Sequence, residues 1–326
     1  MSKLSTEKSF PPERFEDIYT EVYGISSAYP GVFEKLIENE IIIGADSDIA
    51  ITYTQYKTWF QNGWGDTLHY LLSTKDYPFI QYEDALGFIE DNQLMKEYLS
   101  SDDFYPYKRD IPSASSKNLP PALAWPQKDL LSYSSNKGSP LADNIDEYSE
   151  FERIGIVMKA AFGALEENSF GHGKFPKKIP PSGGSRHPSS GYLCDIYGDL
   201  GEKGTSYLYQ QYLHSFLPID KNSNLEQAIN DGCYNFLKHS GFQARYCIFI
   251  TSDFVKSMWR YRDSRSYRVL YNDCGHIIRI LNYTLRLMGY SFQEFSFIDE
   301  GKVAEILKLE LGENKCEHAI YGLFIR

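Results

Sequence analysis

The stretch PPSGGSRHPSSGYL at residues 180–193 combines residue types that could bring main chain close to a ligand. Gly183 and Gly184 have no Cβ, so the backbone can approach a flat or charged group closely there. The neighbouring prolines fix φ and limit how far the loop can move. Arg186 adds a planar fork of donors that suits a phosphate or a polar ring edge. Surface turns have the same composition, so the stretch alone leaves a binding loop and a plain turn as alternatives.

The whole chain has the composition of a globular protein. It has 326 residues, 42% of them hydrophobic and 15% aromatic, which is enough to bury a sizeable core. The first residues lack an apolar signal segment, and no apolar run approaches the roughly 18 residues of a spanning helix. We therefore expect a cytoplasmic protein without a membrane span. Five widely spaced cysteines with no CxxC pair favour reduced, packed thiols over a disulfide framework.

The charge of the chain limits its partners. The formal net charge is −11, which argues against nucleic acid or an anionic membrane surface. An anionic small ligand would need a local basic pocket. No cluster of side chains has the spacing of a metal site, so no metal is expected.

Apolar periodicity predicts several strands and helices around the loop, and their order implies an α+β sandwich. Strands are expected at residues 192–200, 246–254 and 318–326. Helices are expected at residues 148–165, 223–241, 266–290 and 297–311. Gly241 should end the second of these helices, because a left-handed residue costs little at glycine.

The first third of the chain is predicted to form a separate unit. Residues 1–102 are expected to be a small mixed domain, with helices at 29–47 and 82–99 and a strand at 46–56. Residues 103–129 contain DIPSASSKNLPPALAWPQK, which has no helical or strand period and is expected to be a Pro-rich linker. Residues 130–326 would then form the main domain.

The longest predicted helix carries an extended apolar stripe. The stripe runs from Val269 to Met288 at steps of three and four residues, and Gly289 supplies the stop. It is longer than one core face needs, so part of it is expected to be buried against a second copy of the chain. The sequence therefore predicts a homodimer.

Three motifs in this chain resemble a known family. PPSGGSRHPSSGYL resembles the PSGGxRHPxExY segment of the SagB-type dehydrogenases, a peptide-modifying branch of the FMN-dependent nitroreductase superfamily. Residues 204–219, GTSYLYQQYLHSFLPI, resemble its GLYxYxPxxHxLxxL element. Residues 260–290 are similar to its KYxxRxYRxxxLDAGHxxxNLxLxAxxLG element. The motifs occur in the family order, and the resemblance covers about residues 130–326.

The resemblance implies a fold, a cofactor and a set of contacts. The fold would be a nitroreductase-like sandwich of a mixed β-sheet flanked by helices, in a homodimer with FMN at the subunit interface. The loop Pro181-Ser182-Gly183-Gly184 would lie along the isoalloxazine ring and offer N–H groups to its polar edge. Arg186 would reach the phosphate or a ring carbonyl, His187 would brace the loop, and the final residue, Arg326, would add charge for the phosphate.

The chain departs from the family pattern in two binding elements. Ser190 stands where the family has glutamate, so the resemblance does not support the ring or interface contact that the glutamate would make. The family's N-terminal phosphate motif RRSxRxF is also absent. Ser134, Ser135 and Lys137 are the nearest candidates, with a solvated loop as the alternative.

A third departure concerns the chemistry. Family members that oxidise azolines to azoles use a Lys-Tyr pair to remove a proton from carbon, whereas this chain has Arg260-Tyr261. Arginine stays protonated and is a poor general base, so the replacement disfavours azoline oxidation. Lys256 would be the alternative base, unless it is an ordinary surface lysine.

The Arg260-Tyr261 pair suits the reverse reaction better. Reduction of a dehydroalanine or dehydrobutyrine residue requires a proton at the α carbon, and a phenol of pKa near 10 can supply it. Arg260 could polarise the peptide carbonyl. Flavin enzymes of lanthipeptide pathways resemble this family and make D-amino acids in this way. The pair could also be ordinary surface residues at a helix start.

Three functions stay open at this point. The favoured one is an FMN-dependent oxidoreductase that reduces dehydro residues in a ribosomally made precursor peptide, beside other peptide-modifying enzymes. The second is an azoline dehydrogenase, and the third is a non-catalytic scaffold that binds a leader peptide or a modifying enzyme. Among weaker candidates, Asp273 and His276 lie in a DAGH-like motif, and Tyr207 and Tyr209 either pack over the ring or alternate on a strand.

Overall fold

The computed structural model describes residues 55–75, 85–101, 110–120, 145–170, 173–309, 311–312 and 315–326. The chain divides into two compact units, Met1–Tyr77 and Pro78–Arg326. The first contains the short helices α4 (Lys57–Gln61) and α5 (Gly65–Thr74). The predicted helix at 29–47 and almost all of the predicted strand at 46–56 lie outside the described residues. No helix in the described ranges is long and apolar enough to cross a membrane.

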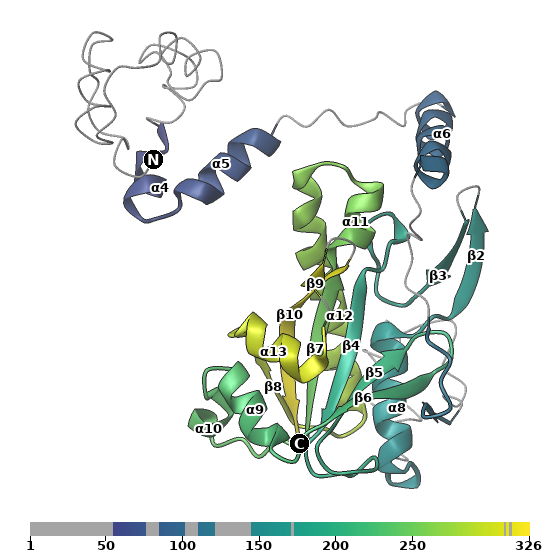
Figure 1. Cartoon of the computed structure of the whole chain (residues 1–326), viewed down its shortest axis with the longest axis vertical. Coiled ribbons are helices and arrows are strands. Elements are labelled where there is room, and N and C mark those ends of the chain that lie inside the picture. The colour runs from purple at the N-terminus through teal and green to yellow at the C-terminus, as the bar shows by residue number, and fades with distance from the viewer. Residues whose placement is uncertain are drawn as a thin grey trace. The chain divides into compact units, whose positions relative to one another are not determined.

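A large antiparallel sheet forms the centre of the second unit (Figure 1). Its strand order is β1-β6-β5-β4-β7-β10-β8, with β9 paired to β10. The bounds are β1 Lys117–Asn118, β4 Ser189–Asp195, β5 Thr205–Gln210, β6 Ser215–Lys221, β7 Tyr246–Asp253, β8 Phe292–Phe295, β9 Leu311–Gly312 and β10 Lys315–Ile325. A separate hairpin joins β2 (Glu166–Phe170) to β3 (Gly173–Lys177).

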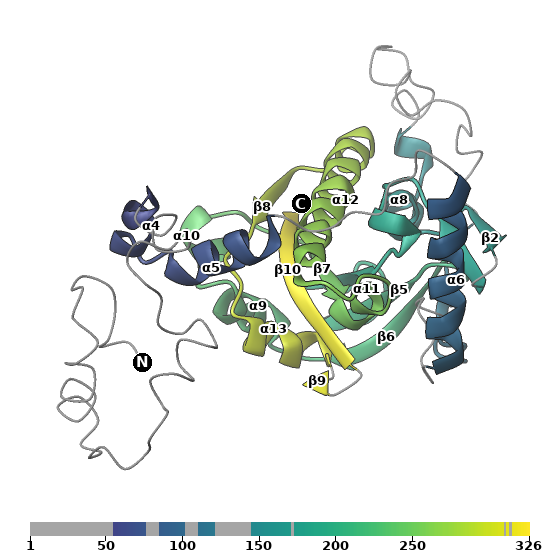
Figure 2. The same ribbon diagram turned by 90° about the horizontal axis from the view of Figure 1, so that it is seen from above.

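Helices cover both faces of the sheet (Figure 2). One face carries α8 (Glu150–Phe162) and α12 (Tyr267–Leu287), and the other carries α9 (Leu225–Gly232), α10 (Phe236–Ser240) and α13 (Glu300–Leu307). A short helix, α11 (Phe254–Arg260), follows β7 directly, and a 3-10 turn, η5 (Ser264–Ser266), leads into α12. The predicted α+β sandwich is confirmed.

The long helix α12 forms where the apolar stripe predicted it. Leu270, Cys274, Ile277, Leu281 and Leu285 are all buried, at steps of three and four residues. Cys274, Ile277, Leu281 and Leu285 pack within their own chain, against the sheet and α8. Most of the stripe is therefore used by the core of one subunit, whereas Val269 and Ile278 are only half-buried. The homodimer stays a prediction.

The predicted helix at 223–241 is interrupted. It forms two helices, α9 and α10, because Tyr234 and Asn235 have φ of +51° and +59°, which no α-helix can accommodate. Gly241 ends α10 in the left-handed conformation, as predicted, with φ of +66°.

The Pro-rich segment takes part in the sheet. Residues 117–118 form β1 and pair with β6, and the Asp110 carboxylate accepts hydrogen bonds from three successive N–H groups of the β5–β6 turn, at Gln211, Tyr212 and Leu213. Helix α6 (Ala85–Ser101) also belongs to the second unit. The division between units thus falls after Tyr77, whereas the sequence pattern placed a linker at 103–129. Contacts remote in sequence decide this boundary.

Candidate functional site

The loop at residues 178–188 lies at one end of the sheet, between β3 and β4. Its end adjoins the register pair Ser189 and Ser252, where β4 begins and β7 is about to end. The loop contains a single 3-10 turn, η4 (Gly183–Ser185). Gly184 and Ser185 both have φ of +55°, and His187 has φ of +47°. Such backbone is held by surrounding contacts, because side chains disfavour it.

Helix α12 holds this loop through the DAGH-like motif. The Asp273 carboxylate accepts a hydrogen bond from Ser182 Oγ at 2.6 Å and another from the Gly183 N–H at 3.0 Å. His276 Nδ1 lies 3.2 Å from the Pro181 carbonyl oxygen. The tertiary structure thus joins two of the motifs that carried the family resemblance.

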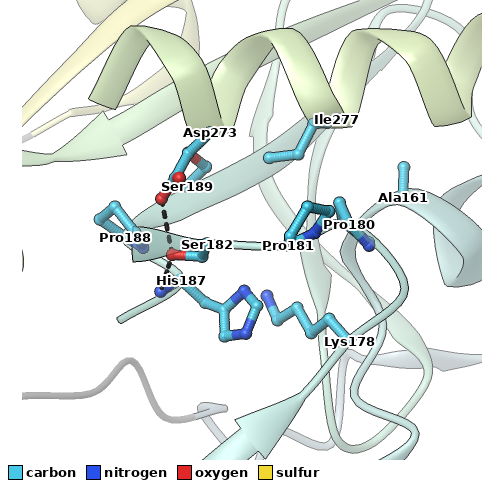
Figure 3. A pocket seen from close by; sticks show the side chains of 10 residues that line it. All are labelled: Ala161, Lys178, Pro180, Pro181, Ser182, His187, Pro188, Ser189, Asp273 and Ile277. Carbon is cyan, nitrogen blue, oxygen red and sulfur yellow. Dashed lines mark hydrogen bonds between the residues drawn. The ribbon is translucent and has the colours of Figure 1, made fainter. Parts of the chain in front are cut away.

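Ser182 and His187 brace the loop from within. Ser182 Oγ also accepts a hydrogen bond from the His187 N–H at 2.9 Å (Figure 3). Burial, with Lys178 and Arg186 nearby, lowers the pKa of His187 to about 3. His187 is therefore neutral at pH 7. Burial raises the pKa of Asp273, while the bonds from Ser182 and Gly183 oppose that shift.

The two glycines are required by packing inside the protein. A Cβ on Gly183 would lie 2.3 Å from Val269 Cγ1 of α12. A Cβ on Gly184 would lie 2.2 Å from the Tyr261 hydroxyl. The sequence pattern was interpreted as space for a ligand, but helix α12 and Tyr261 themselves approach the loop backbone.

Several loop N–H groups are already engaged. Those of Gly183 and His187 donate to Asp273 and Ser182, and those of Ser185 and Arg186 donate to loop carbonyls. Fewer N–H groups are therefore left for a ligand than the sequence pattern predicts.

Arg186 is packed inside the loop. Its side chain is only 3% exposed, and its Nε donates to the Gly184 carbonyl at 3.0 Å. The guanidinium lies 5.5 Å from the ring centroid of Trp259. Arg186 therefore has a packing role in the loop. Its contact with a cofactor stays a prediction.

Arg260 is the last residue of α11 and Tyr261 follows it directly. Both side chains are partly buried. The Arg260 guanidinium is 5.0 Å from the Tyr261 ring centroid, and its Nη2 donates to Asp91 Oδ1 of α6 at 2.5 Å. Burial raises the pKa of Tyr261 against the opposing influence of Arg260 and Arg186. The phenol is therefore protonated at neutral pH. The alternative that the pair is ordinary helix-start surface does not fit this environment.

Sequence reasoning missed the contribution of α6 to this site. Tyr98 of α6 packs edge to face on Trp259, with ring centroids 6.0 Å apart, and the Arg262 guanidinium lies 3.6 Å from the Tyr98 centroid. Asp91 is buried together with Met95, one turn away. A carboxylate on the buried stripe of a helix was the signal that could have identified it.

A small cavity lies beside the loop (Figure 3). Its volume is about 10 Å³, enough for about one water molecule. Ser189 Oγ is buried there without a hydrogen-bond partner among the described residues. The lining residues are Ala161, Lys178, Pro180, Pro181, Ser182, His187, Pro188, Ser189, Asp273 and Ile277.

Other predicted residues lie apart from the loop. Arg326 follows Ile325, which pairs with Tyr246 at the opposite end of β7, and its guanidinium lies 5.3 Å from the Phe242 ring centroid. One subunit therefore does not bring Arg326 to the loop. Ser190 is buried in β4 opposite Thr251. Ser134, Ser135 and Lys137 lie outside the described residues.

The two tyrosines of the second motif belong to the core. Tyr207 and Tyr209 are two residues apart on β5 and therefore share one face of the strand. They are 1% and 4% exposed, and both pack with Phe216. The expectation of ordinary strand packing is confirmed.

Comparison with known proteins supports the fold. No family model matches the chain. A putative nitroreductase from Anabaena variabilis superimposes with a TM-score of 0.52 at 18% identity, over 72% of this chain and 46% of that one. The chain has a nitroreductase-like fold. The microcin synthetase McbBCD complex of E. coli, with truncated pro-MccB17 bound, gives a TM-score of 0.43 at 16% identity over 78% of this chain and 96% of that one, which is too weak to add support.

A sequence relative of this nitroreductase-like chain is a processing protein. The trifolitoxin-processing protein TfxB of Rhizobium leguminosarum bv. trifolii is 25% identical over 229 residues, which are 68% of this chain and 60% of TfxB. The chain thus spans less than two thirds of the length of this relative. The fold and this sequence similarity both agree with the resemblance of the three motifs to SagB-type, nitroreductase-like proteins.

Proposed function

We propose that this chain is an FMN-dependent oxidoreductase that reduces dehydroalanine or dehydrobutyrine residues in a ribosomally made peptide. One observation carries the proposal: the protonated Tyr261 hydroxyl lies against Gly184, in the loop that resembles the family's flavin-binding segment. This contact supports a proton donor beside the proposed flavin site. The similarity to a trifolitoxin-processing protein supports the tailoring of a biosynthetic product.

The described residues fit FMN in their donor chemistry. Lys178 supplies positive charge beside the cavity. The Ser189 hydroxyl, which is buried without a hydrogen-bond partner among the described residues, offers a donor in the same cavity. Pro180 and Pro181 add apolar surface against which a flat ring can pack. These residues, with Ser182 and Gly184, would hold the group.

The cavity of about 10 Å³ is too small for an isoalloxazine ring. The ring would therefore lie on the open face of the loop and would need a second surface to cover it. We propose that a second copy of the chain supplies this surface and that the protein is a homodimer. Light scattering at micromolar concentration tests this point, because a monomeric mass with FMN still bound would contradict it.

When bound, FMN supplies the hydride that the reaction requires. Tyr261 holds the proton that the α carbon must receive, and its raised pKa keeps that proton in place at neutral pH. Arg260 lies against the Tyr261 ring and presents positive charge to a peptide carbonyl as negative charge develops on its oxygen. Its partner Asp91 limits the orientations that the guanidinium can adopt.

Mass spectrometry of a defined peptide tests the reaction. With FMN and a chemical reductant, the protein should convert a dehydroalanine peptide to a product about two mass units heavier, one hydride plus one proton. An azoline peptide incubated with oxidised FMN serves as the comparison. A loss of about two mass units there, with no change of the dehydroalanine peptide, would assign the opposite direction. A purified protein that takes up no FMN would instead favour a non-catalytic scaffold.

A further inference from the structure

A buried ion pair links helix α6 to the end of α11. Arg260 Nη2 and Asp91 Oδ1 are 2.5 Å apart, and the two side chains are 14% and 11% exposed. Charges this far from water are held in one arrangement by their partner, because separating them leaves an uncompensated buried charge. The contact between Tyr98 and Trp259 fixes the same two helices side by side.

The ion pair continues into the proposed site. Arg260 lies against the ring of Tyr261, and the Tyr261 hydroxyl lies against Gly184. A shift of the Asp91 carboxylate would therefore move the guanidinium and, through it, the phenol. Asp91 itself contacts neither the loop nor Tyr261 in any hydrogen bond among the described residues.

We propose that Asp91 is a positioning residue for the Arg260-Tyr261 pair, so that helix α6 is a part of the site. The segment that has no counterpart in the family motifs would then contribute to the chemistry. This inference rests on the proposed function only in assigning that pair a role on the peptide.

The charges that face Tyr261 determine what the loss of Asp91 should do. Arg260 on α11 and Arg186 in the loop favour the phenolate, whereas Asp273 on α12 and Asp91 on α6 favour the neutral phenol. Removing the Asp91 charge leaves Arg260 less compensated. The pKa of the phenol should fall. As the pH is raised, a reaction that needs the protonated phenol should then begin to slow at a lower pH than in the original protein.

The test compares Asp91→Asn with Glu90→Gln, which removes the same charge from an exposed position on the same helix. With 3-fluorotyrosine incorporated at position 261, fluorine NMR follows the titration of the phenol in the full-length protein. We expect the phenol at position 261 to titrate at a lower pH in Asp91→Asn than in the original protein. In Glu90→Gln its titration midpoint should be unchanged. With FMN bound, Asp91→Asn should also reduce the dehydroalanine peptide about tenfold more slowly, a moderate effect for a misplaced group.

Unchanged titration and unchanged rate in a folded Asp91→Asn protein would overturn the inference. The titration reports the link between Asp91 and Tyr261 whatever reaction the enzyme performs, so it separates this inference from the proposed function. If Asp91→Asn does not fold, Asp91→Glu takes its place, because it keeps the charge and displaces the carboxylate by one methylene. A positioning role then predicts slower reduction at a nearly normal titration midpoint, and a rate equal to that of the original protein contradicts it.

Discussion

The hydroxyl of Tyr261 occupies the space in which a side chain at Gly184 would begin. A Cβ at Gly184 would lie 2.2 Å from this oxygen. Gly184 and the tyrosine of the Arg260-Tyr261 pair therefore exclude any larger group between them. The two residues lie far apart in the sequence and belong to different motifs of the family resemblance. Their contact brings the loop and the Arg260-Tyr261 pair together in one candidate site.

Substitution of Gly184 by alanine should therefore damage the site more than backbone strain alone explains. Gly184→Ala combines φ of +55° with a collision against Tyr261, and strain of this kind costs about 1–3 kcal/mol. Gly241→Ala is the matched control, because Gly241 has φ of +66° and nothing within 4 Å of its Cβ position. Urea unfolding should show a larger loss of stability for Gly184→Ala, and the added variant Tyr261→Phe should restore part of it.

Tyr261→Phe by itself should keep the fold and bound FMN but slow peptide reduction by about 10²- to 10⁴-fold, the usual contribution of one general acid. The phenyl ring can still pack beside Arg260, whose guanidinium is 5.0 Å from the ring centroid. The rate of peptide reduction, followed by mass spectrometry in Tyr261→Phe and in the original protein, tests this prediction. Reduction at the original rate would remove Tyr261 from the reaction.

Arg260→Lys should not improve the reductive reaction, although it introduces the lysine that the family motif has at this position. Lysine cannot reproduce the planar contact that Arg260 makes with Asp91 and the Tyr261 ring. We expect slower reduction and some oxidation of an azoline peptide. Faster reduction in this variant would show that the arginine is not suited to that direction.

Arg186→Ala should lose FMN and also destabilise the protein. The guanidinium is buried and its Nε donates to the Gly184 carbonyl, so its removal leaves that carbonyl without this partner, at a cost of about 1–3 kcal/mol. FMN occupancy after gel filtration and the urea midpoint measure the two effects. Full occupancy would show that Arg186 is not a principal support of the cofactor site.

His187 should make the protein sensitive to acid. Its pKa is lowered to about 3, so between its ordinary value near 6.5 and about 3 the unfolded chain binds a proton that the folded chain rejects. The stability that His187 contributes is present above pH 6.5 and is lost as the pH falls toward 3.

His187→Asn should flatten this acid limb, because asparagine tolerates the positive φ of this position and does not titrate. Urea midpoints between pH 7 and pH 4 measure the slope. His239→Asn, at an exposed site, is the control. A slope equal to that of the control would show that His187 is not buried in its neutral form.

The elements with strong periodicity were predictable from the sequence. Helix α12 and strand β7 form where apolar spacing placed them, because burying such a stripe needs only local geometry and a nearby core. Strand β4 (Ser189–Asp195) overlaps the predicted strand at 192–200 only at residues 192–195. The break between α9 and α10 was not visible, since the positive φ values of Tyr234 and Asn235 depend on surrounding packing. The role of residues 110–120 at the edge of the sheet was likewise set by distant partners.

The site divides in the same way between sequence and tertiary structure. The order and spacing of residues in the sequence identified the candidate site residues. These are the glycine loop followed by Arg186, and the phenol of Tyr261 next to the permanent positive charge of Arg260. Only the tertiary structure decided that Asp273 holds the loop, that Arg186 turns inward, and that Asp91 pairs with Arg260. Such pairings follow from which side chains are buried together, since a charged or polar group removed from water must find a partner wherever the fold supplies one.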